Sequence, residues 1–315
     1  MLSRKPYLTV KIEAERVGFE VFVNGGFVAT DLSAMANSEV WPINQLLRSG
    51  KNQLALLVYP QQLVPNGPLT YQPGAKVTVT VFVSESGVAN APEYEIATLC
   101  FDGASAGTNQ VSARSSPAGD LNSLQAFAPV RHGDVTVGPA QLQQVDFDHK
   151  QLLTRELTLP LPFPEWAFLR SDRMVPTFEL GEKGVLQHHA EVLPAYEAIW
   201  KALNARDLDK LLPLFEERSR EIDLATYKAV GTTQAELRHD FEETLGDSTR
   251  SLAPLLHERS PYWSYEVGPM GTMVRLSTGV HGGGIIRFPK TGDRKSRTTF
   301  PISFRKQGAE FIVSR

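Results

Sequence analysis

The first half of the chain consists of short runs in which apolar and polar residues alternate. Five runs rich in Val, Phe, Tyr and Leu are separated by clusters of Gly, Pro and Asn, and they read YLTVKIEAE, FEVFVNGGFVAT, NQLALLVYP, AKVTVTVFVS and YEIATLCFD. Alternation with a period of two is typical of strands that bury one face. Because no long helical stretch interrupts these runs, the spacing predicts two packed antiparallel sheets, a β-sandwich.

The dipeptide Asn24-Gly25 lies between two of these runs and is the strongest short-range signal for a β-hairpin. After it, the segment Ile43 to Val58 reads I-x-x-L-L-x-x-G-x-N followed by a strand. A V-N-G hairpin followed by this turn resembles the jelly-roll, galactose-binding-like domains found beside many glycosidase domains. The resemblance covers about the first 85 residues. It implies a fold and does not imply sugar binding.

The second half begins with helical periodicity. Tyr196, Ile199, Trp200 and Leu203 recur at the spacing of one helix face, and a second apolar stripe follows from Leu208 to Phe215.

A third helix is predicted over TTQAELRHDFEETLGD. Thr232 or Thr233 would be its N-cap, Glu236 would complete a capping box from Thr233, and Gly246 would end it.

Strand-like runs follow these helices: YWSYEVGP, TMVRLSTG, GIIRFPK, TTFPISFRKQ and EFIVSR. Helices followed by an antiparallel meander predict an α+β arrangement. A first helix reading Y-x-x-I-W-x-A-L-N-A-R-D-L-D-x-L-L-x-L-F, with a strand at the very end, resembles the nuclear-transport-factor and SnoaL-like cone fold. That resemblance covers about residues 188 to 315, and it implies a curved sheet around helices with a pocket inside.

Three regions follow from these patterns. A chain of 315 residues is about twice a typical domain, so two domains are expected. We predict a β-sandwich domain over residues 1–160, a Pro-rich junction over 161–187 and a cone-like α+β domain over 188–315. The junction begins in LTLPLPFPEW, where the prolines exclude a central strand.

Cysteine content and hydropathy point to the cytoplasm. The single cysteine, Cys100, excludes an intrachain disulfide framework. No apolar run suits a signal peptide, and no window approaches a membrane span. We therefore expect a cytoplasmic protein with no membrane partner, and because no cofactor motif is present we expect no cofactor.

Two motifs suggest a serine hydrolase, and their context argues against one. Gly103 to Gly107 matches the G-x-S-x-G nucleophile elbow around Ser105, and His281 opens an HGGG stretch. The elbow needs a following helix and a parallel sheet, whereas Pro117 interrupts the sequence after Ser105 and an antiparallel sandwich surrounds it. The glycines are better explained by a strand interrupted for close backbone approach. We therefore predict no catalytic residues.

The histidines do not indicate a metal site. His188 and His189 stand next to each other near Glu191, but adjacent helical residues point about 100° apart and no third ligand stands at a useful spacing.

Charge is distributed in blocks of opposite sign. From His188 to Glu258 there are eight Lys/Arg and fourteen Asp/Glu, and from Arg259 to Arg315 there are ten Lys/Arg and three Asp/Glu. The acidic segment has two interpretations: the wet face of an amphipathic helix, or a surface that attracts a basic partner. The basic loop could contact nucleic acid, but the acidic helices nearby would repel a polyanion, so we expect a protein partner. The candidate partner-binding residues are Glu216, Glu217, Glu221, Asp223, Tyr262, Trp263, His281, Arg287, Lys290, Arg294, Lys295 and Arg297.

The overall build, with the stretches IDLATYKAVGTTQAELRHDFEETL and GPMGTMVRLSTGVHGGGIIRFPK, resembles immunity proteins of type VI secretion systems. This resemblance implies a stoichiometric inhibitor that binds a cognate antibacterial effector, a nuclease toxin of the cytoplasm. Two alternatives stay open. One is an enzyme or small-molecule binder that uses the cone pocket, lined by Tyr262, Trp263, Arg275 and His281. The other is carbohydrate binding by the sandwich.

Overall fold

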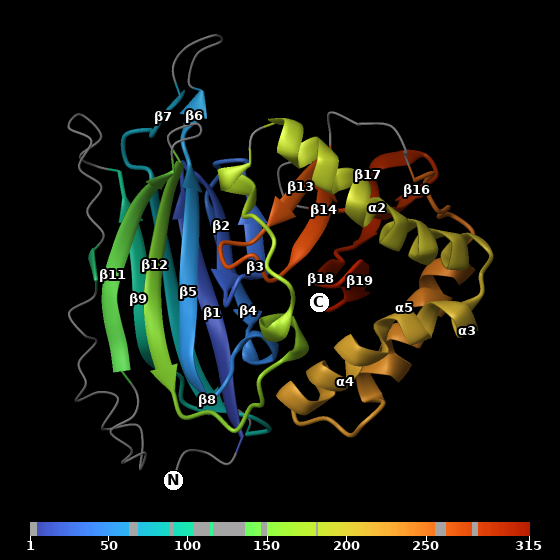
Figure 1. Ribbon diagram of the computed structural model, residues 1–315, viewed down its shortest axis with the longest axis horizontal. Helices are drawn as coiled ribbons and strands as arrows, with labels where there is room; N and C mark the ends of the chain where they lie inside the picture. Colours follow the sequence, from blue (N-terminus) through green and yellow to red (C-terminus); the bar gives the residue numbers. More distant parts are fainter. Residues whose placement is uncertain are drawn as a thin grey trace. The chain divides into compact units, whose positions relative to one another are not determined.

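The computed structural model divides the chain into two compact units, Met1–Trp166 and Ala167–Arg315. It describes residues 5–62, 69–88, 91–103, 114–115, 136–145, 150–180, 182–255, 263–278 and 283–315. Most of the described structure is antiparallel sheet, with a few helices (Figure 1). No helix among the described residues is long and apolar enough to cross a membrane.

The first unit contains two five-stranded antiparallel sheets (Figure 1). One has the order β10 (Arg114–Ser115), β9 (Tyr94–Asp102), β8 (Lys76–Glu85), β1 (Pro6–Glu15) and β4 (Asn37–Pro42). The other has the order β11 (Thr136–Val145), β12 (Lys150–Leu159), β5 (Gly50–Tyr59), β2 (Gly18–Val23) and β3 (Gly26–Asp31). The short helix η1 (Asn44–Leu46) and the hairpin of β6 (Gln61–Gln62) with β7 (Leu69–Thr70) connect them.

The alternation of apolar residues places one face of these strands in the core. Val10 and Ile12 of β1 are fully buried and pair with Val81 and Val79 of β8, which are also fully buried. Glu13, the residue after Ile12, points to the other face and is exposed. The period of two therefore sets which face is apolar, as the sequence predicts.

The Asn-Gly hairpin is confirmed. Asn24 and Gly25 join β2 to β3 with φ angles of 53° and 79°, and positive φ at both positions is what a two-residue hairpin turn of this kind requires. The Asn24 side chain is buried, donates to the Leu46 carbonyl at 2.8 Å and donates to Asn52 Oδ1 at 2.8 Å. Asn52 Nδ2 in turn donates to the Gly50 carbonyl at 2.9 Å. The asparagine and glycine of the Ile43 to Val58 segment thus build the turn.

The second unit places its helices before most of its strands. The helices are α2 (Glu182–Asn204), α3 (Leu208–Leu211), α4 (Glu216–Ala225) and α5 (Thr232–Gly246), with shorter turns η2 (Ala167–Arg170), η3 (Thr177–Glu179) and η4 (Leu212–Phe215). The sheet has the order β13 (Trp263–Val267), β14 (Val274–Thr278), β18 (Ser303–Gln307) and β19 (Glu310–Val313), and β15 (Gly283–Gly284) pairs with β14. A separate hairpin joins β16 (Ile286–Lys290) to β17 (Asp293–Phe300).

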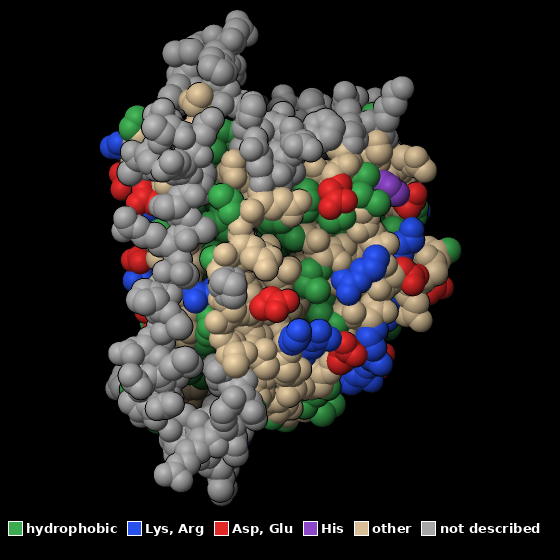
Figure 2. Space-filling view, turned by 60° about the vertical axis from the view of Figure 1, so that its left-hand side comes forward, with side chains coloured by type: hydrophobic (Ala, Val, Ile, Leu, Met, Phe, Trp, Pro, Cys, Tyr) green, Lys and Arg blue, Asp and Glu red, His purple; other side chains and the backbone are tan. Residues whose placement is uncertain are grey.

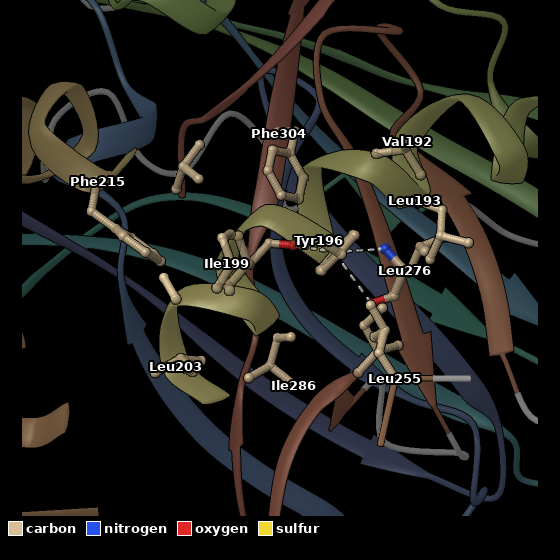
Figure 3. Close-up of a cluster of buried hydrophobic side chains, with 14 of the residues drawn as sticks. Val192, Leu193, Tyr196, Ile199, Leu203, Phe215, Leu255, Leu276, Ile286 and Phe304 are labelled. Atoms are coloured by element: carbon tan, nitrogen blue, oxygen red, sulfur yellow. Dashed lines mark hydrogen bonds between the residues drawn. The ribbon is translucent and has the colours of Figure 1, made fainter. Parts of the chain in front are cut away.

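Tyr196 of α2 is the centre of the second unit's core (Figure 3). Its ring packs edge-on against Phe304 at 4.8 Å between centroids. Its hydroxyl accepts from the Leu276 N–H at 2.9 Å and donates to the Ile302 carbonyl at 2.6 Å. The β14–β18 ladder ends at the pair Arg275 and Ser303, so Leu276 and Ile302 would be the next pair. The tyrosine hydroxyl bridges two backbone groups that the sheet leaves apart.

The predicted close backbone approach in the glycine stretch is confirmed at Gly284. A Cβ atom at this position would lie 2.1 Å from the Phe300 carbonyl oxygen, a distance that no side chain tolerates. His281, at the start of the stretch, and Ser105 of the G-x-S-x-G match lie outside the described residues.

The start of α5 differs from the predicted capping box. Gly231, with φ of 89°, precedes the helix, and neither threonine caps it. Asp223 of α4 instead accepts from the N–H groups of Gly231 at 2.7 Å and Thr233 at 2.8 Å. Glu236 forms an ion pair with Lys228 at 2.6 Å. A capping side chain ten residues upstream leaves no local sequence pattern. The S/T-x-x-E pattern therefore predicted a capping box that does not form.

The Pro-rich junction buries aromatic side chains in both units. Phe163 and Trp166 are buried in the first unit, and Phe168 and Phe178 are buried in the second. The boundary between the units, at residues 166 and 167, falls inside the predicted junction of 161–187.

Candidate functional site

Helix α4 carries all four acidic residues that the sequence singles out as partner-binding candidates. Glu216 is exposed and Glu217 is partly buried, whereas Glu221 and Asp223 are buried. Buried carboxylates need partners within the protein, because an unpaired buried charge is costly. The structure supplies those partners from distant parts of the second unit.

Glu217 binds Arg305 of β18 through both carboxylate oxygens. Arg305 Nε donates at 2.7 Å and Nη2 donates at 2.6 Å. Arg305 Nη1 also donates to Gln307 Oε1 at 2.7 Å. The hydrogen bond with Glu217 raises the pKa of Arg305 above its ordinary value. This is the two-pronged geometry in which arginine and carboxylate bind best.

Glu221 connects the two ends of the second unit. Its Oε1 accepts from the Ala167 N–H at 2.8 Å, and its Oε2 accepts from Arg315 Nη1 at 2.7 Å. The Arg315 guanidinium also stacks over the Phe168 ring at 4.8 Å. Burial lowers the pKa of Arg315, and the attraction of Glu221 opposes that effect.

Asp223 has a capping function. Burial alone would raise its pKa, but hydrogen bonds from Thr233 and from the N–H of Gly231 outweigh burial, so the pKa lies below its ordinary value. The carboxylate is held charged at the start of α5, where the helix dipole also favours a negative group.

The opposite charge blocks of the sequence therefore meet inside the fold. On α4, Glu217 pairs with Arg305 of β18, and Glu221 pairs with Arg315, which follows β19. Glu191 of α2 pairs with Lys306 of β18 at 3.3 Å. Figure 2 shows Lys and Arg side chains next to Asp and Glu side chains on one face of the molecule. Three of the four acidic candidates thus have an intramolecular role, and Glu216 is the one left on the surface.

Arg218, also on α4, is the exception in this cluster. It is partly buried, and within the described structure its guanidinium has no hydrogen bond or ion pair. Burial lowers its pKa to about 10, and repulsion from Arg315 adds to the effect. The group still carries its charge at neutral pH. Sequence reasoning missed it, because two arginines, Arg218 and Arg220, between two glutamates read as a solvated helix face.

Arg275, a predicted lining residue of the cone pocket, is neutralised. Its Nε donates to Glu266 at 2.5 Å, and the Ser277 hydroxyl donates to the other oxygen of the same carboxylate. These three side chains lie on neighbouring strands β13 and β14. The Glu266 carboxylate therefore accepts hydrogen bonds from both the Arg275 guanidinium and the Ser277 hydroxyl.

The remaining candidates are only partly covered by the structure. The basic loop forms the β16–β17 hairpin, with Arg287 partly buried and Lys290 exposed. Arg294, Lys295 and Arg297 lie on β17 and Trp263 begins β13, but their side chains lie outside the described ones, as do the residues Tyr262 and His281. Among the described residues no three His, Cys, Asp or Glu side chains are grouped to hold a metal ion.

The first unit exposes apolar side chains at the edge of a sheet. Met35, Val40 and Trp41 are 64%, 57% and 43% exposed. They lie on the β3–β4 loop and on β4, the terminal strand of its sheet. The sequence run ANSEVWP carries one signal of this surface, because the proline after Trp41 indicates an edge strand.

The loop that presents Met35 is ordered by Asp31. This side chain accepts from the Ser33 N–H at 2.8 Å and from Asn37 Nδ2 at 3.1 Å. Between them Ala34 has φ of 57°, a conformation that costs a non-glycine residue about 1 kcal/mol. The loop is held in one conformation in spite of that cost.

Comparisons with known proteins give no relatives. No protein-family model matches the sequence, and searches of curated proteins and of solved structures find no significant match.

Proposed function

We propose that this protein acts by binding another protein stoichiometrically, as an immunity protein does when it neutralises a secreted effector. The observation that carries the proposal is the exposure of Met35, Val40 and Trp41 along an ordered sheet edge. Exposed tryptophan is enriched among the residues that dominate binding energy at protein interfaces. Three large apolar side chains are exposed within seven residues at this edge, and Val40 and Trp41 lie on opposite faces of β4, because neighbouring strand residues alternate.

The backbone of β4 adds a second binding element. The Ile43 N–H donates to the Leu8 carbonyl at 3.0 Å, which fixes the alternation of hydrogen bonds along β1 and β4. Ser38 and Val40 therefore direct their N–H and C=O groups away from β1. Within the described structure no hydrogen bond uses these groups. An extended segment of a partner could add a strand here.

The strained Ala34 supports the same surface. Backbone strain that is held in place by specific hydrogen bonds is a feature of binding sites, because it fixes a side chain before the partner arrives. Here it fixes Met35 beside the edge strand.

This proposal places the leading surface in the first unit, whereas the sequence candidates lie in the second. The finer architecture is part of the proposal: a jelly-roll-like sandwich carries the binding edge, and a cone-like α+β unit follows it. A nuclease effector of the cytoplasm is the partner that the resemblance to immunity proteins implies.

The test is capture of the partner with matched surface variants. The tagged protein is used to isolate a stoichiometric partner, and binding is then measured for the wild type, Trp41→Ser and Val230→Ser. Val230 is 88% exposed but lies on the α4–α5 turn, so it controls for loss of an exposed apolar side chain. We expect Trp41→Ser to weaken binding by about 2 kcal/mol, roughly 30-fold, with Val230→Ser unchanged.

Two results would refute the proposal. One is a partner whose affinity is indifferent to Trp41→Ser and to Val40→Lys. The other is the absence of any stoichiometric partner from a lysate that contains the effector encoded with this protein. Loss of binding on changing Lys290 or Glu216 instead would assign the interface to the second unit.

A further inference from the structure

The outer edge of β4 fits an identical edge on a second copy of this chain. β4 ends its sheet, and the N–H and C=O groups of Ser38 and Val40 point away from β1 and have no hydrogen bond within the described structure. Open edges of this kind are templates for pairing with another strand. A two-fold axis perpendicular to the sheet would bring the same edge of two copies together, with the two strands antiparallel.

Hydrogen bonding and charge restrict how the two edges can be aligned. Outward-pointing residues must face each other, so the axis passes through a residue and not between two. An axis through Glu39 would set the two Glu39 side chains directly opposite each other, where like charges destabilise a sheet. An axis through Val40 would set Ser38 opposite Pro42, which has no N–H to donate. An axis through Ser38 avoids both faults, because it sets Glu39 opposite Asn37.

The axis through Ser38 also gives the exposed apolar side chains apolar neighbours. Each Ser38 N–H would donate to the Ser38 carbonyl of the other copy. Trp41 would lie opposite the second copy's Met35, and Val40 would lie opposite its Ala36, and all four residues are exposed. Because Trp41 and Val40 lie on opposite faces of β4, apolar contacts would form on both faces of the joined sheet.

We propose that, without another partner, two copies of this chain join their β4 strands antiparallel, with Ser38 on the two-fold axis. This inference goes beyond the proposed function and does not rest on it, because it concerns the chain alone. Both use the same edge, so a partner that adds a strand to β4 would displace the second copy.

Sedimentation equilibrium of the full chain tests for the dimer. The dimer fraction should rise with protein concentration, and no larger species should form, because each edge is closed by its twin. Trp41→Ser should raise the dissociation constant of the dimer at least about tenfold. Val230→Ser is the matched control, since Val230 is exposed on the α4–α5 turn, and it should leave the dissociation constant unchanged.

Cysteine cross-linking tests the register. In a hydrogen-bonded antiparallel pair the Cα atoms lie about 5.5 Å apart, a distance that a disulfide spans, so oxidised Ser38→Cys should form a covalent dimer. Val40→Cys is the control, because the two copies of residue 40 would lie about 14 Å apart along the strands. The wild type, with Cys100 as its single cysteine, should stay unlinked.

Three outcomes would overturn the proposal. They are a wild type that stays monomeric at every concentration, a dimer that Trp41→Ser leaves unchanged, and failure of Ser38→Cys to cross-link more readily than Val40→Cys. None of them bears on the proposed function, whose own test is the binding of a captured partner to Trp41→Ser.

Discussion

The hydroxyl of Tyr196 offers a sharp test of how the second unit is held together. In Tyr196→Phe the ring and its packing against Phe304 stay, and only one oxygen is lost. That oxygen accepts from the Leu276 N–H and donates to the Ile302 carbonyl, both in fully buried surroundings. The substitution therefore leaves one donor and one acceptor without partners at the point where the β14–β18 ladder stops.

The expected loss follows from those two groups. Leaving a buried polar group unsatisfied costs about 1–3 kcal/mol, so two of them should cost about 3 kcal/mol after some relaxation. For a domain of about 150 residues, each kcal/mol lowers the melting temperature by roughly 3–4 °C, so a fall of about 10 °C is expected. Within the described residues every α-helix belongs to the second unit, so ellipticity at the helical band reports on this unit.

Tyr265→Phe is the control. Tyr265 is also buried in this core, but no hydrogen bond of its hydroxyl is formed in the described structure. Removing this hydroxyl should lower the free energy of unfolding by less than about 1 kcal/mol. If Tyr196→Phe proved no more destabilising than Tyr265→Phe, the bridge between the two strands would not contribute as argued, and the unpaired groups must find each other directly.

Two further changes test other parts of the fold. Asp223→Asn weakens the cap on Gly231 and Thr233, so urea unfolding near neutral pH should show a loss of about 1–2 kcal/mol. Because the pKa of Asp223 is lowered in the folded state, its contribution is present above the ordinary value of 3.8 and is lost as pH falls through the lowered one. The difference between wild type and variant should therefore vanish in acid, and a difference independent of pH would contradict a charged cap. Gly284→Ala would place a Cβ against the Phe300 carbonyl, so we expect a loss of more than about 3 kcal/mol or failure to fold; a wild-type melting curve would show that the backbones are not so close.

Local features of this fold could be predicted from the sequence, and long-range ones could not. The alternation in β1 and the turn at Asn24-Gly25 depend on residues next to each other, so pattern and propensity suffice. The pair of Glu217 with Arg305 joins residues 88 positions apart. The sequence shows two charge blocks there, but it does not show whether they attract each other or a partner.

The sequence also did not predict how exposed individual side chains are. Trp41 is followed by a proline, which indicates an edge strand, but its position on the outermost strand of this sheet depends on the order in which the strands pair. Arg218 was missed for another reason, because charged residues on a helix are usually solvated.

The carboxylate of Glu221 also bears on how the second unit can be cut and rejoined. It holds the first backbone N–H of this unit, at Ala167, and the side chain of Arg315, so the two ends of the unit meet at one group. A fragment that began at residue 188, the boundary suggested by the sequence, would lack Ala167 together with the buried ring of Phe168 under Arg315. A fragment that began at Ala167 would keep both. Because its ends are neighbours, the same unit is a suitable scaffold for circular permutation, with a short linker across the old termini and new ends opened at an exposed turn such as the one around Val230.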